Sequence, residues 1–151
     1  PSWSNHYPSD HYPFMYKTRS KYNSIIKIRL ADILLLKAEA YVETGNLQAA
    51  AALVNTVRNR AKLADLPATT VSSKEKMADA VLNERRLELA YEGQRWFDLV
   101  RTGKVFSILN SLNTRDSGRL PMTPVTEETV LLPVPQTQID KNPNLTQNKG
   151  Y

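Results

Sequence analysis

Charged residues interrupt the apolar face of the stretch VLNERRLELAYEGQRWFDLVRTG, which begins at residue 81. At the helical period of 100° per residue, its apolar side chains share one face. They are Val81, Leu82, Leu89, Trp96, Leu99 and Val100. The charged side chains on that face or along its edge are Glu84, Arg85, Glu88, Glu92 and Arg95. Because a buried charge is costly without a partner, we predict that these five residues form a structural ion network.

The expected ion pairs of this stretch lie along one helix, where residues about one turn apart are neighbours. Arg85 should lie near Glu84 and Glu88. Glu92 should lie near Arg95. The network would then fix a packing register, and no catalytic role is expected for any of its members.

Trp96 falls on the apolar face beside Leu89, and we predict that its ring packs in the core. Asp98 is predicted to point away from that face. At helical spacing, Asp98 is expected to pair with Arg101 or Arg95.

Two helices are predicted by apolar periodicity over 25–44 and 47–61. Gly45 is a suitable C-terminal cap for the first helix, and Asn46 a suitable N-cap for the second. The expected apolar face of the first helix consists of Ile28, Ile33, Leu34, Leu35, Ala38, Tyr41 and Val42.

A third helix should open at a capping box from Ser72 to Glu75 and run to about Glu92. A break at the following glycine separates it from a short helix over 94–101, which should end at Gly103.

The first two helices together have tetratricopeptide-like spacing. Ala38 and Tyr41 are followed by Gly45, and then by Ala50 and Val54. The small residues Ala38 and Ala50 would allow the two helices to approach closely. Since one repeat cannot bury its own face, we expect this hairpin to stack on further helices.

We predict one domain, in which three segments differ in composition and expected secondary structure. Residues 1–24 are irregular and rich in aromatic side chains, residues 25–112 form the helical core, and prolines make residues 113–151 irregular. The predicted fold is all-α, with a tetratricopeptide-like hairpin, further helices and a long proline-rich C-terminal wrap. The amide-rich end of the chain can fray or dock by hydrogen bonds to backbone.

Composition excludes several function classes. Without cysteine there are no disulfides, thiolate metal sites or thiol nucleophiles. His6 and His11 flank Asp10 but match no established ligand spacing, so we expect neither a metal nor a cofactor. The net charge of +5 comes with no nucleic-acid motif, so no nucleic-acid partner is expected. No apolar run is long enough to span a bilayer, and the chain, which begins without Met, is expected to be part of a longer protein.

Five blocks of the sequence resemble, in order, the C-terminal part of SusD/RagB-type proteins. They are IRLADILLLKAEAYVETGN at 28–46, VNTVRNRAKL at 54–63, LNERRLELAYEGQRWFDLVRTG at 82–103, LLPVPQTQID at 131–140 and NPNLTQNKGY at 142–151. The resemblance implies a helical fold built on tetratricopeptide-like hairpins. It also implies a lipid-anchored protein of the bacterial outer-membrane surface that binds glycans or other nutrients. Its partner would be a SusC-like TonB-dependent outer-membrane transporter, and it would perform no chemistry.

The matching blocks are scaffold signatures, so the resemblance supplies no ligand contacts. On chemistry alone, the candidates are three aromatic residues of the N-terminal segment, because the C–H face of a sugar stacks on such rings. They are Trp3, Tyr7 and Tyr12.

Two other functions compete with this interpretation. The ladder of Glu84, Glu88 and Glu92 could serve a glycoside hydrolase as an acid and base pair, although arginines interleave with it. The helical hairpin could belong to a tetratricopeptide-like protein interaction module, which would require several repeats.

Overall fold

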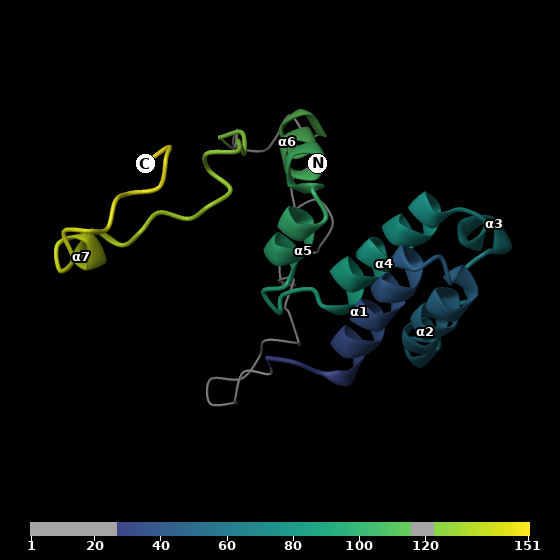
Figure 1. Ribbon diagram of the computed structural model, residues 1–151. Helices are drawn as coiled ribbons and strands as arrows, with labels where there is room; N and C mark the ends of the chain where they lie inside the picture. The colour runs from purple at the N-terminus through teal and green to yellow at the C-terminus, as the bar shows by residue number, and fades with distance from the viewer. Residues whose placement is uncertain (1–26, 116–122) are drawn as a thin grey trace, which may run out of the picture. The chain divides into compact units, whose positions relative to one another are not determined.

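The computed structural model describes residues 27–115 and 123–151 (Figure 1). The described residues contain helices and no β-strand, which confirms the all-α prediction. They fall into two compact units that divide between Asp98 and Leu99. Each unit is described by itself.

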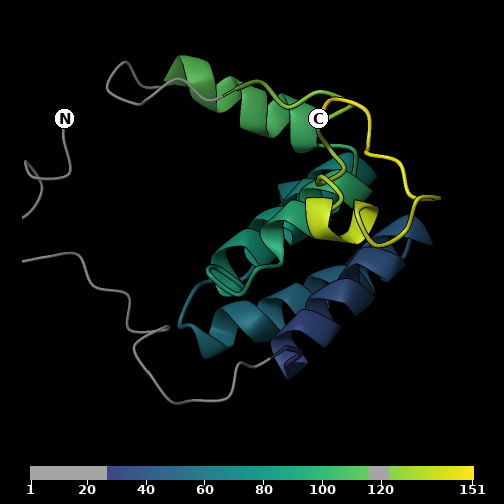
Figure 2. The ribbon, with the colours of Figure 1, turned by 90° about the vertical axis from the view of Figure 1, so that its left-hand side faces the viewer.

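The first unit is built on three helices that pack together (Figures 1 and 2). Helix α1 packs against both of the others and makes this unit a single small core. These three helices are α1 (Leu30–Glu43), α2 (Leu47–Arg60) and α4 (Lys74–Glu88). The unit also contains the single turn α3 (Ala68–Val71) and the first residues of α5 (Arg95–Arg101).

The turn between α1 and α2 has the caps that the sequence predicts. Gly45 has a φ of +80°, and its N–H donates to the carbonyl of Val42. The N–H of Asn46 donates to the carbonyl of Tyr41, which completes a Schellman motif. The side chain of Asn46 then accepts from the N–H of Ala49 and caps α2. The helical hairpin is therefore encoded locally.

Small side chains let α1 and α2 approach closely. Ala38 and Ala50 are both fully buried, as the hairpin pattern predicts. The other members of this hydrophobic cluster are Ala31, Leu35, Val42, Ala51, Val54, Val57, Met77 and Val81.

The apolar face of α1 is narrower than its sequence indicates. Ile28 precedes the helix and is exposed, and Ile33 is also exposed. The buried stripe instead includes the charged residue Asp32. The prediction of Ile28 and Ile33 as core-facing residues was wrong, because α1 begins at Leu30 and its core-facing stripe is centred on Leu35 and Ala38.

Helix α4 starts one residue later than predicted and ends earlier. Ser73, not Ser72, is the N-cap, because its hydroxyl oxygen accepts from the N–H of Lys76. The Ser73 hydroxyl also donates to Glu75, and this hydrogen bond lowers the pKa of that carboxyl. The helix ends at Glu88, and the following turn holds Tyr91 at a φ of +66°.

The second unit contains α6 (Val105–Arg115) and α7 (Gln136–Ile139). A second Schellman pair ends α5, since Gly103 donates to Val100 and Lys104 to Leu99. This confirms the predicted end at Gly103.

The C-terminal tail docks onto an earlier segment of the same unit. The Gln147 amide both donates to the carbonyl of Val134 and accepts from its N–H. Asn148 donates to the carbonyl of Leu132, and Lys149 pairs with Glu128. In Figure 1 the chain runs out to α7 and returns. The predicted packing of residues 131–135 as a wrap against the helices stays a prediction, as do the segment boundaries at residues 24 and 112.

Truncating residues of α1 should distinguish its buried face from its exposed face by the loss of stability that each change causes. Leu35→Ala should lower the free energy of unfolding by about 2–5 kcal/mol, because it leaves a cavity in the core. The neighbouring Leu36 is 39% exposed, so Leu36→Ala is the matched control and should cost less than about 1 kcal/mol. Urea unfolding followed by circular dichroism measures both, and equal losses would contradict the assignment.

Candidate functional site

Arg85 lies at the centre of a buried ion cluster. Its Nε donates to Asp98 Oδ2 at 2.9 Å, and its Nη1 donates to Asp32 Oδ1 at 2.8 Å. The Arg85 side chain is 2% exposed, and both aspartates are buried. One guanidinium therefore joins α1, α4 and α5 within the first unit.

Helix ends supply part of the compensation for these buried charges. Asp32 and Asp98 lie in the first turns of α1 and α5, while Arg85 lies in the last turn of α4. Negative groups are stabilised near helix N-termini and positive groups near C-termini. The cluster holds one positive and two negative side chains, and the two helix N-termini offset the excess negative charge.

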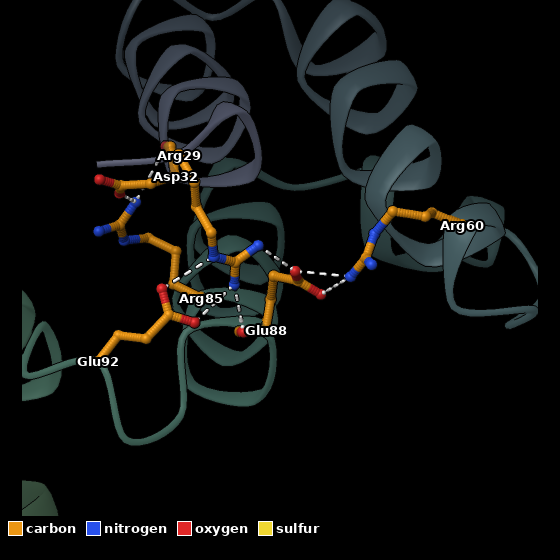
Figure 3. A network of polar contacts seen from close by, with 6 residues as sticks. All are labelled: Arg29, Asp32, Arg60, Arg85, Glu88 and Glu92. Carbon is orange, nitrogen blue, oxygen red and sulfur yellow. Dashed lines mark hydrogen bonds and ion pairs between the residues drawn. The ribbon is translucent and has the colours of Figure 1, made fainter. Parts of the chain in front are cut away.

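Arg29, directly before α1, binds the end of α4 and the turn after it (Figure 3). Its Nε and Nη2 donate bidentate hydrogen bonds to the Glu92 carboxylate, at 2.8 Å each. Its Nη1 donates to Glu88, and Nη2 also donates to the Glu88 carbonyl at 2.6 Å. Chiefly through the hydrogen bond to Glu92, these contacts raise the pKa of Arg29 above its usual value.

Helix α2 contributes two further arginines to the same surface of α4. Arg60 donates through Nη2 to both oxygens of Glu88, at 2.7 and 2.8 Å (Figure 3). Arg58 Nη1 donates to the buried Glu84 at 2.9 Å. Glu88 is thus shared by arginines from two different segments.

The ion pairs run between helices, whereas the sequence spacing indicated pairs along one helix. Arg85 bonds Asp32 and Asp98, and it pairs with neither Glu84 nor Glu88. Asp98 was wrongly predicted to point away from the apolar face, because its carboxylate is buried against Arg85.

Sequence reasoning missed the residues that complete these pairs. The missed partners are Arg29, Asp32, Arg58, Arg60 and Asp98. One signal was present, because Asp32 follows Ala31 on the buried stripe of α1, where an isolated charge calls for a distant partner. Helical spacing alone does not reveal partners that lie on other helices.

A hollow of about 390 Å³ lies at the turn between α4 and α5. Trp96 lines this hollow and is only half-buried. The prediction that its ring packs in the core was therefore wrong. Arg95 also lines the hollow and donates a long hydrogen bond of 3.4 Å to the carbonyl of Leu82. Burial and the nearby charge of Arg86 lower the pKa of Arg95. The full lining is Arg85, Arg86, Leu89, Ala90, Tyr91, Gly93, Arg95 and Trp96.

The predicted ligand-contacting residues Trp3, Tyr7 and Tyr12 lie outside the described residues, and so do His6 and His11. Within residues 27–115 and 123–151, no group of three or more histidines and carboxylates is placed to hold a metal ion. No helix in this part of the chain has the length and hydropathy of a membrane span.

Residues 3–151 match the sequence profile of the SusD family. The chain belongs to the SusD family. The predicted resemblance is thereby confirmed.

Two curated relatives are similar to this chain at 32–36% sequence identity. SusD-like protein P38 of Formosa agariphila is 36% identical over 134 residues, which cover 85% of this chain and 25% of that protein. The starch-binding protein SusD of Bacteroides thetaiotaomicron is 32% identical over 149 residues, which cover 99% of this chain and 25% of that protein. The chain spans about a quarter of the length of these curated relatives.

Solved structures share the fold. A SusD superfamily protein from Bacteroides vulgatus aligns with a TM-score of 0.66 and 30% identity, covering 83% of this chain and 27% of that one. Surface glycan-binding protein A from Bacteroides thetaiotaomicron aligns with a TM-score of 0.65 and 28% identity, covering 84% of this chain and 25% of that one.

Removing the Arg85 guanidinium should take a charged hydrogen-bond partner away from two buried carboxylates. Arg85→Met should therefore lower the free energy of unfolding by about 3–5 kcal/mol. Arg86→Met is the matched control, since Arg86 is exposed and, among the described residues, its side chain bonds Asn83 on its own helix. Its cost should stay within about 0.5 kcal/mol. Thermal and urea unfolding measure both variants, and a small loss for Arg85→Met would remove the cluster from the stabilising core.

Proposed function

We propose that this chain is part of a non-catalytic glycan-binding protein on the surface of a bacterial outer membrane. The protein would be lipid-anchored there and would pass its oligosaccharide, or another nutrient, to a SusC-like TonB-dependent transporter. The observation that carries the proposal is the family match over residues 3–151. A relative named for starch binding and a structural neighbour named for glycan binding support it.

The ion cluster supports a scaffolding role for the central helices. Glu84, Glu88 and Glu92 each accept hydrogen bonds from arginines of other segments. A glycosidase needs two carboxylates that face each other across a sugar, one to protonate the leaving group and one to act as nucleophile or base. Carboxylates already bound to guanidinium groups on one helix end do not offer that arrangement.

We assign ligand binding to the N-terminal segment and a scaffolding role to the helices. For the aromatic N-terminal segment we retain Trp3, Tyr7 and Tyr12 as proposed contacts, on the chemistry of sugar stacking. Truncating a ring that stacks on a sugar removes that contact and weakens binding. Truncating a ring elsewhere on the surface leaves binding unchanged.

Binding to a glycan array, followed by titration of the best ligand, tests this proposal on the full-length protein. Trp3→Ala, Tyr7→Ala and Tyr12→Ala should each weaken the affinity about tenfold, or about 1.4 kcal/mol. Phe97→Ala is the control, because Phe97 is an exposed ring that does not line the hollow. Affinities that are unchanged in all three variants would reject these contacts, and a protein that binds no saccharide would reject the function.

A further inference from the structure

We propose that the hollow at the turn between α4 and α5 binds an acidic sugar residue, one that carries a carboxylate or a sulfate group. This inference rests on the proposed glycan-binding function and adds a second site with its own ligand chemistry. The site is built from the last turn of α4, residues 90–93 and the first turn of α5.

Positive charge at the hollow exceeds what the described residues neutralise. Arg29, Arg58, Arg60 and Arg85 each bind carboxylates at 2.9 Å or closer. Within the described parts of the chain, neither Arg86 nor Arg95 forms an ion pair. Arg86 bonds the side-chain oxygen of Asn83, and Arg95 bonds a backbone carbonyl.

Arg95 is the arginine with the most to gain from a bound anion. Burial disfavours its charge, and the charge of Arg86 adds repulsion, so its pKa is lowered. The charge of Asp98 offsets part of this effect, but the Asp98 carboxylate is held by Arg85. A carboxylate or sulfate placed between Arg86 and Arg95 would remove the repulsion and form charge-assisted hydrogen bonds with planar guanidinium groups.

Two aromatic residues supply the apolar half of a sugar site. Trp96 and Tyr91 both line the hollow, with Leu89 buried beside them. Tyr91 is 67% exposed. Its φ of +66° is a strained backbone conformation for a residue with a side chain. Rings beside cations suit a pyranose whose C–H face stacks while its charged group is bound. The volume of about 390 Å³ lies within the range of small-ligand sites.

The test uses the full-length protein, two pairs of glycan probes and, as an acidic polypeptide, poly-glutamate. Oligogalacturonate presents carboxylates and is compared with a neutral galactan, while dextran sulfate presents sulfates and is compared with dextran. Affinity electrophoresis and titration calorimetry are performed on the wild type and on Arg86→Met, Arg95→Met and Tyr91→Ala. Arg101→Met is the matched control, because it removes an exposed arginine of α5 that does not line the hollow.

Either acidic probe should bind at least tenfold more weakly to Arg86→Met and Arg95→Met than to the wild type or Arg101→Met. The wild-type affinity should fall as NaCl is added. Tyr91→Ala should weaken the same probe, since it removes the ring that would stack on the sugar. Selectivity between oligogalacturonate and dextran sulfate identifies the charged group.

Three outcomes would overturn the inference. If the arginine variants bind acidic and neutral glycans as the wild type does, the hollow is not a site, and the proposed glycan binding is untouched. If the variants lose thermal stability with unchanged affinities, another part of the protein fills the hollow. If poly-glutamate binds at the arginines and neither acidic glycan does, the ligand is an acidic protein segment. A wild type that binds no saccharide would reject the proposed function as well.

Discussion

Contacts between arginines and carboxylates hold the ends of the helices of the first unit together. Arg85 reaches Asp32 on α1 and Asp98 on α5 from the last turn of α4. Arg29 and Arg60 meet at Glu88 from the start of α1 and the end of α2. A buried ion pair contributes less stability than its Coulomb energy suggests, because both charges are desolvated. It does fix orientation, since a mispacked helix would leave a charge buried and unpaired.

The elements that the sequence predicts well are those that local chemistry decides. Gly45, Asn46 and Gly103 end or begin helices where the pattern places them, because their caps need only near neighbours. The capping residue at α4 was misplaced by one position, since Ser72 and Ser73 have the same chemistry and only backbone geometry distinguishes them. Local signals of this kind define elements but not their partners.

The partners of the charged residues could not be read from helical spacing. Periodicity identified Arg85 as a charge in a buried stripe, but its bonds are to residues 53 and 13 positions away. Likewise, Trp96 lies on an apolar face only if one helix continues through residue 96, and the turn at Tyr91 ends that continuity. The hollow lies at this turn, and Tyr91 and Trp96 both line it.

The central claim is that the guanidinium of Arg85 and its carboxylates act as one coupled unit that sets how the helices meet. A double-mutant cycle of Arg85→Met and Asp98→Asn, measured by urea unfolding, tests it most directly. The account predicts a coupling energy of about 2–3 kcal/mol, because either single change already removes the contact between Arg85 and Asp98. Losses that add to within about 0.5 kcal/mol would contradict it.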